Sequence, residues 1–132
     1  VVIGAVQNLR YHFVFATKFR RGCFSGIEGD VVRAIEYAVS KSSCKLERVA
    51  VEDGDHVHLV VRMSGTYSVS GLVNRLKSLS SHHLWEMQGD HLRRFYWGGR
   101  HYLWSGGYYA ATIGDVSADH VDKYLKKQGH WK

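Results

Sequence analysis

The feature that most constrains the fold is a pair of β-type runs separated by only two residues. Residues 45–53 read KLERVAVED, with Leu46, Val49 and Val51 as apolar positions, and residues 56–63 read HVHLVVRM. The letters GD lie between them. Alternating runs rich in β-branched residues are typical of strands, and a short glycine turn between two of them favours an antiparallel hairpin. The sequence therefore predicts a hairpin in the middle of the chain.

Helical and strand-like patterns alternate on both sides of this hairpin. Aromatic and β-branched residues predict a first strand over 10–19 and a last strand over 108–114. Apolar residues recur at helical spacing over 28–43 and over 68–87. A final helix is predicted for 117–131, beginning at a serine that can cap it. The order β-α-β-β-α-β predicts an α+β fold, a ferredoxin-like split β-α-β antiparallel sheet with an additional C-terminal helix.

The totals indicate one basic globular domain over residues 1–132. Eighteen Lys and Arg against 12 Asp and Glu give a formal net charge of +6. Such a surplus favours a polyanionic partner such as nucleic acid, although a cationic surface kept for solubility has the same total. Two cysteines without metal-type spacing indicate free thiols in a reducing compartment. With no apolar run of about 18 residues and no convincing signal peptide, a cytoplasmic protein without membrane contact is expected.

Two histidines stand at alternate positions at the start of the second hairpin strand. On a strand, His56 and His58 point to the same face, opposite Val57 and Leu59. Imidazole is a common ligand of divalent metals, so adjacent rings on one face can chelate one ion. The alternative is a half-buried strand with histidines on its wetter face. No P-loop pattern is found, so no nucleotide cofactor is expected.

The last predicted helix carries a second chemical candidate. Tyr124 and Gln128 are four residues apart and lie on one helical face, with His120 one turn before them. A tyrosine beside a metal can act as a nucleophile, provided that a base or cation helps, because its ordinary pKa is near 10. The alternative is that Tyr124 packs with Val121 and Leu125.

Cationic and aromatic residues are interleaved at 18–21 (KFRR), 93–104 (RRFYWGGRHYLW) and 123–127 (KYLKK). Cations neutralise phosphates and rings stack on exposed bases, so this pattern favours single-stranded nucleic acid over an ordinary solvated surface. The residues expected to contact it are Arg10, Lys18, Arg20, Arg21, Arg75, Lys77, Arg93, Arg94, Arg100, Lys123 and Lys127.

Taken together, these parts resemble the HUH single-strand DNA transposases with one catalytic tyrosine, the insertion-sequence-200-like family. The resemblance rests on four blocks in order: YHFVFATKFRR, DHVHLVV, LVNRLKSLSSHHL and YLKKQ, which together span about residues 9–128. A weaker fifth block, LWSGGYYAATIG, has Ser105 where the family often has proline. Each block alone is unspecific, whereas their order and spacing are specific.

The resemblance implies a function and a set of site residues. His56 and His58 match the ligands of a Mg²⁺ or Mn²⁺ ion, Gln128 the third ligand, and Tyr124 the nucleophile. The family nicks and rejoins single-stranded DNA at insertion-element ends through a 5′-phosphotyrosine, with a hairpin recognised beside each end. The resemblance also implies a homodimer, because two element ends need two active sites. It leaves open whether Tyr124 acts in cis or in trans.

Other functions fit parts of the sequence. A non-catalytic nucleic-acid-binding module could stack bases on Tyr11, Phe13 and Phe15, as an RNA-recognition motif does, although the signature of that motif is missing from HVHLVVRM. A metal-dependent phosphoesterase without a covalent step would not need Tyr124. A domesticated transposase relative and a rolling-circle nicking enzyme would use similar chemistry.

Overall fold

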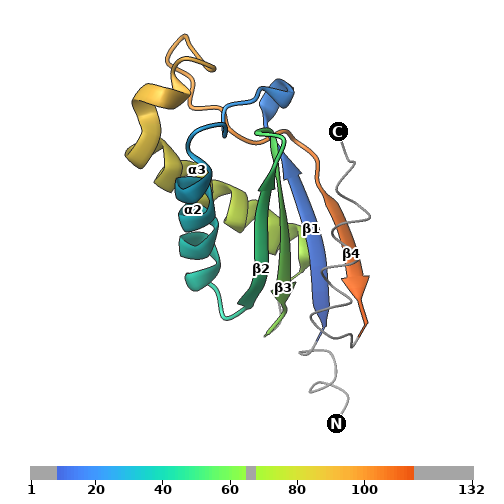
Figure 1. The fold of residues 1–132 in the computed structure, drawn as a ribbon. Helices are drawn as coiled ribbons and strands as arrows, with labels where there is room; N and C mark the ends of the chain where they lie inside the picture. The colour runs from blue at the N-terminus through green and yellow to red at the C-terminus, as the bar shows by residue number, and fades with distance from the viewer. Residues whose placement is uncertain (1–8, 65–67, 115–132) are drawn as a thin grey trace.

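Four antiparallel strands form one sheet in the computed structural model, which describes residues 9–64 and 68–114. The strands are β1 (Arg10–Ala16), β2 (Lys45–Glu52), β3 (His56–Arg62) and β4 (Tyr109–Ile113), in the order β2-β3-β1-β4. Helices α2 (Glu28–Ser40) and α3 (Val69–Leu92) cover one face of the sheet (Figure 1). This is the predicted ferredoxin-like α+β fold. The C-terminal helix predicted for 117–131 lies outside the described residues.

The main core lies between the sheet and the two helices. Phe13 and Phe15 of β1 and Leu59 of β3 are fully buried and belong to one cluster with Ile35 of α2 and Leu76 of α3. Burial of these side chains is the main force that holds the helices on the sheet. Because Phe13 and Phe15 are buried beneath the helices, they cannot stack bases, which counts against the alternative of an RNA-recognition-type platform on this strand.

A bulge in β2 explains how its apolar residues share one face. Strict alternation would place Leu46 on the opposite side from Val49 and Val51, yet all three pack against the main core. The pairing with β3 shifts between Leu46 and Arg48, which leaves Glu47 as an extra residue. A β-bulge of this kind reverses the alternation. The three predicted apolar positions are therefore confirmed, and the bulge is the reason that they share one face.

Helix α3 runs further than predicted. The pattern predicts an end near residue 87, whereas the helix bends at Gln88 (φ −129°, ψ 32°) and continues to Leu92. Gly89 and Leu92 are buried, and Leu92 packs in a second cluster around Trp85. Tertiary burial therefore carries the helix past a glycine that the sequence suggests as its end.

Helix α2 ends earlier than predicted, at Ser40. In the described part of the chain, no helix is long and apolar enough to cross a membrane.

The first strand is shorter than its pattern predicts. Pairing ends at Ala16, and Lys18–Arg20 form the short 3₁₀ turn η1. Phe19 and Arg20 have φ angles of 62° and 53°, a region that residues other than glycine rarely adopt. The turn places the KFRR segment beside residues 101–103 of the long connection to β4, since the amide of Lys18 donates to the carbonyl of Leu103 at 2.8 Å.

Candidate functional site

His56 and His58 lie on the sheet face that points away from the helices. Strand alternation puts Val57 and Leu59 into the main core and both imidazoles on the other side, as predicted. The rings are 1% and 2% exposed, and their centroids are 5.1 Å apart. Fully buried His12 of β1 joins them, with its Nε2 3.3 Å from Nδ1 of His58. These are buried rings, which excludes the alternative of two histidines on a wet face.

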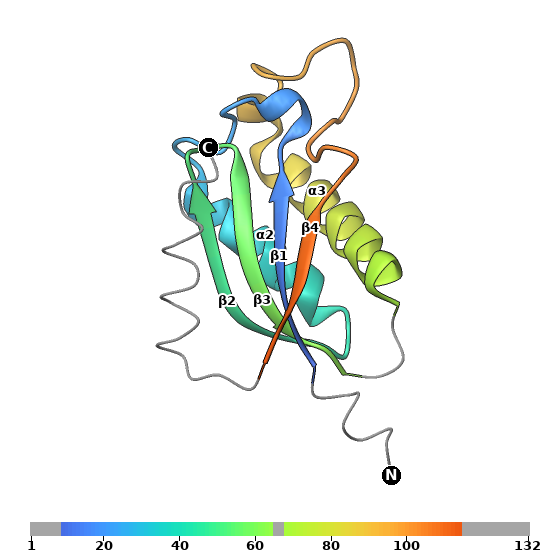
Figure 2. The same ribbon diagram turned by 90° about the vertical axis from the view of Figure 1, so that its right-hand side faces the viewer.

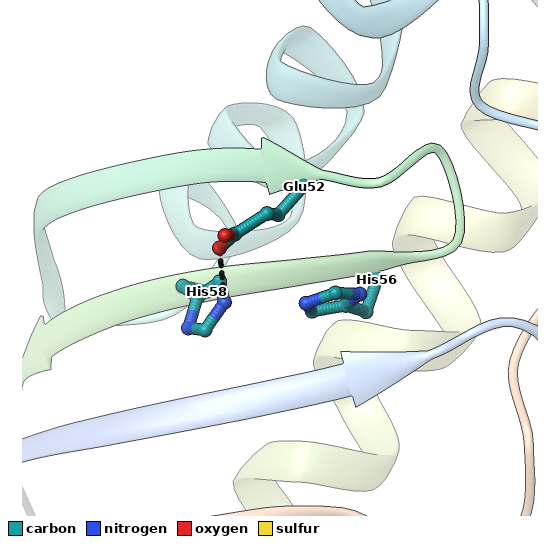
Figure 3. Close-up of side chains that lie close together, drawn as sticks. All are labelled: Glu52, His56 and His58. Atoms are coloured by element: carbon teal, nitrogen blue, oxygen red, sulfur yellow. Dashed lines mark ion pairs between the residues drawn. The ribbon is translucent and has the colours of Figure 1, made fainter. Parts of the chain in front are cut away.

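A carboxylate on the neighbouring strand completes a cluster with these rings. Glu52, the last residue of β2, pairs with His56 across the hairpin, and its Oε2 lies 2.9 Å from Nε2 of His58 (Figure 3). One ligand atom from each of Glu52, His56 and His58 lies within 4.8 Å of the others. The sequence reasoning missed Glu52. The signal was present, because Val51 faces the core and its neighbour must face the histidine side.

The cluster has the features of a site for a divalent cation. Nδ1 of His56 lies 2.7 Å from Oδ1 of Asp55, whereas its buried Nε2 has no hydrogen-bond partner among the described residues. Metal-bound imidazoles commonly have one nitrogen held by a carboxylate and the other directed at the ion. Together with Glu52 and His58, this arrangement supplies nitrogen and oxygen donors of the kind that can hold a divalent cation.

Burial keeps the imidazoles of His12 and His58 neutral. Desolvation, and next the charge of His58, lower the pKa of His12 to about 4. Desolvation also lowers the pKa of His58, although the nearby carboxylate of Glu52 opposes the shift. A neutral imidazole is the form that binds metal, so the rings do not have to lose a proton at neutral pH.

Two of the cations predicted to contact nucleic acid have partners within the fold. Nε of Arg10 lies 3.0 Å from the carboxylate of Glu47. Lys77 donates to the carbonyl oxygens of Ser105 and Gly107 at 2.9 and 2.7 Å, and burial lowers its pKa. Lys77 therefore holds the connection to β4 against α3, at the block where the sequence departs from the family pattern.

The remaining predicted cations separate into three groups. Arg75 is exposed on α3, where it reaches the carbonyl of Lys41. Arg93 and Arg94 are exposed just after the helix, and Arg93 reaches the carboxylate of Asp90. Another group gathers around the 3₁₀ turn and the connection between α3 and β4, and consists of Lys18, Arg20, Arg21 and Arg100. The third group consists of Lys123 and Lys127, which lie outside the described residues. The predicted nucleophile Tyr124 and the predicted ligand Gln128 lie outside them too.

Known proteins match this chain along most of its length. Residues 5–128 match the family model described as "Transposase IS200 like". The chain is 33% identical over 125 residues to the transposase for insertion sequence element IS200 of Salmonella typhimurium, an alignment covering 92% of this chain and 77% of the relative. It is 26% identical over 126 residues to the ISDra2 transposase TnpA of Deinococcus radiodurans, covering 95% and 87%.

Solved structures share the fold. The crystal structure of a Deinococcus radiodurans protein described as a transposase superposes with a TM-score of 0.69 at 23% identity, covering 91% of this chain and 90% of that one. A REP-associated tyrosine transposase bound to a REP hairpin superposes with a TM-score of 0.61 at 14% identity, covering 96% and 71%. These likenesses concern the fold, whereas the family model and the Salmonella relative extend to the sequence itself: the chain belongs to the IS200-like transposase family.

Proposed function

We propose that this chain, as a single domain, is a metal-dependent HUH endonuclease and strand transferase that nicks and rejoins single-stranded DNA at the ends of an insertion element. The observation that carries the proposal is the cluster of half-buried Glu52 with buried His56 and His58, in which Asp55 leaves Nε2 of His56 available. Burial of polar groups is costly for folding unless hydrogen bonds or a ligand satisfy them, and Nε2 of His56 is buried without a hydrogen-bond partner among the described residues. Family membership supplies the transposition context.

The hairpin residues would hold the metal. Glu52, His56 and His58 supply three ligands from the β2–β3 hairpin, and Gln128 is the further ligand implied by the family resemblance. A bound Mg²⁺ or Mn²⁺ would polarise the scissile phosphate and offset the charge that develops on its oxygens. Two imidazoles make Mn²⁺ chemically suitable. Asp55 orients His56 for this task.

Tyr124 would supply the nucleophile. Its phenol loses a proton, and the oxygen attacks the phosphorus in line. A phosphorus–oxygen bond forms while the bond to the 3′ oxygen breaks, which leaves a 5′-phosphotyrosine and a 3′-hydroxyl once that oxygen takes up a proton. A second DNA 3′-hydroxyl then reverses the exchange and frees the tyrosine. Each step keeps one phosphodiester-type bond, so no nucleotide cofactor is needed.

The proposed partner is single-stranded DNA with a hairpin beside each element end. The solved REP-associated tyrosine transposase, which shares the fold, is bound to a REP hairpin. Cleavage of two ends needs two sites, so we include a homodimer in the proposal. Its place of action is the cytoplasm, in keeping with Cys23 and Cys44, which are both free thiols.

The test is the detection of the covalent intermediate. Labelled single-stranded DNA from the flanks of the gene is incubated with the protein and Mn²⁺ and separated on a denaturing gel. We expect a protein-linked DNA band that is lost in Tyr124→Phe and kept in Tyr37→Phe, a matched change at an exposed tyrosine on α2. Cleavage that persists in Tyr124→Phe would favour a phosphoesterase without a covalent step.

A further inference from the structure

A strained turn directly after β1 holds an aromatic ring in solvent. Phe19 (φ 62°, ψ 16°) and Arg20 (φ 53°) both lie in the left-handed region. Such a conformation is costly for a side chain with a Cβ, and it persists only where the surroundings impose it. The ring of Phe19 is nevertheless 62% exposed, so hydrophobic burial does not offset the strain. Strain at an exposed aromatic residue is a signal of function.

A second exposed ring shares a cation with the first. Trp97 is 67% exposed, the largest value among the exposed large apolar side chains of the described residues. The guanidinium carbon of Arg21 lies 4.9 Å from the ring centre of Phe19 and 4.7 Å from that of Trp97. Arg21 also donates to the carbonyl of Phe95, which fixes its position. Two rings that are 78 residues apart in the sequence are thereby held at the same guanidinium.

Two further cations lie on the Phe19 side of this surface, where the ring of Tyr102 is 6.0 Å from that of Phe19. Nζ of Lys18 lies 5.4 Å from the ring centre of Phe19, and Arg100 approaches the nearby ring of Tyr102. The 3₁₀ turn and the connection that follows α3 lie side by side at one end of the sheet (Figures 1 and 2). We call this surface the Phe19–Trp97 platform; it consists of Lys18, Phe19, Arg20, Arg21, Trp97 and Arg100.

The platform adjoins the candidate metal centre through one carboxylate. Nε of Arg20 lies 3.4 Å from Oδ2 of Asp55, while Oδ1 of the same carboxylate lies 2.7 Å from Nδ1 of His56. A ligand on the platform therefore lies next to the hairpin turn that orients a metal-binding imidazole.

We propose that the Phe19–Trp97 platform binds single-stranded DNA beside the cleavage centre, with bases stacked on the two rings and phosphates near the cations. Exposed rings with interleaved cations are complementary to unpaired bases on a charged backbone. The inference rests on the proposed function and adds to it the surface that holds the strand. Because stacking reads no base edge, binding at this surface is tolerant of sequence.

Fluorescence anisotropy with two labelled probes tests the proposal. One probe is oligo(dT), and the other is an abasic oligonucleotide of equal length that keeps the phosphates but lacks the bases. We expect the wild-type protein to bind oligo(dT) more tightly than the abasic strand at the same salt concentration. Phe19→Gly and Trp97→Ala should each weaken oligo(dT) binding by about tenfold and leave abasic binding nearly unchanged.

The choice of glycine separates binding from folding. Glycine adopts the backbone angles of position 19 without strain, so Phe19→Gly should melt close to the wild-type temperature while it loses affinity. Trp97→Phe keeps an aromatic face and should restore most of the affinity that Trp97→Ala loses. The matched control is Tyr37→Ala, which removes another exposed ring, one that stacks on His83 of α3, and should not change binding.

Three outcomes would overturn the platform. They are equal affinity of the wild type for both probes, unchanged oligo(dT) affinity in Phe19→Gly and Trp97→Ala, and an equal loss in Tyr37→Ala.

Failure of the proposed function is distinguishable from these results. A wild-type protein that forms the Tyr124-dependent adduct while the ring variants bind normally overturns only the platform. Base-dependent binding that the ring variants lose, without any covalent adduct, supports the platform and overturns the nicking chemistry.

Discussion

The two faces of the sheet are both buried along β3, yet they carry opposite chemistry. On the helix-covered face, Leu59 belongs to a continuous apolar core. On the other face, His56 and His58 are equally buried but stand with a carboxylate and a third imidazole. Burial of polar groups opposes folding unless their hydrogen bonds are satisfied or a ligand is bound. The first face therefore serves stability, and the second carries the metal centre that we propose.

This contrast predicts that substitutions on the two faces fail in different assays. Changes on the helix-covered face should lower the free energy of unfolding. Changes on the histidine face should leave the fold largely intact and remove the chemistry, as expected where activity depends on an arrangement that is unfavourable for stability.

The largest effect is expected for His56→Ala. Loss of one imidazole ligand should reduce nicking by more than about 100-fold, while DNA binding is largely spared because the cationic and aromatic contacts lie elsewhere. A denaturing gel measures nicking and anisotropy measures binding. The control is His82→Ala, which removes an exposed histidine of α3. Full cleavage by His56→Ala would disprove the metal assignment.

A change on the opposite face of the same strand should give the reverse result. Leu59→Ala leaves a cavity in the main core and should lower the free energy of unfolding by about 2–5 kcal/mol. Urea denaturation measures this loss, and the same titration is carried out on His56→Ala. If the histidine variant lost as much stability as Leu59→Ala, the division of labour between the faces would be refuted.

Glu52→Gln tests the ligand that was found only in the structure. The amide keeps the size of the side chain but loses the charge, so we expect Mn²⁺ affinity to fall by at least about tenfold, with little change in melting temperature. Titration calorimetry with Mn²⁺ reports this without any need for cleavage. Glu86→Gln, at an exposed glutamate of α3, is the matched control. Unchanged Mn²⁺ affinity would remove Glu52 from the site.

The smallest effect concerns the access of reagents to a buried thiol on the helix-covered side. Cys23 is fully buried, and desolvation raises the pKa of its thiol to about 11. Below that pH the thiol stays protonated, and since the thiolate is the reactive form, native protein should resist iodoacetamide at neutral pH. Mass spectrometry of a Cys44→Ser variant before and after unfolding measures this. Rapid labelling of the native protein would show that this side opens.

How much of the site could be predicted differs from residue to residue. The shared face of His56 and His58 was predictable because alternation is a property of the strand itself, and the structure confirms it. The face of Glu52 could be read from the alternation of β2, whereas its place beside His58 depends on the register between two strands. Tyr124 and Gln128 remain predictions from the family resemblance.

The fold shows the same division. Periodicity, residue type and one turn determined the order of strands and helices, because each of these signals reflects the geometry of one local segment. Only the tertiary structure decided the bulge at Glu47, the continuation of α3 through Gly89 and the strained turn at Phe19. Each of these is imposed by partners distant in the sequence: a neighbouring strand, a buried cluster or the connection before β4. By itself the sequence thus determined which residues can do chemistry, whereas packing decided which of them meet, because contact between distant segments depends on the whole fold.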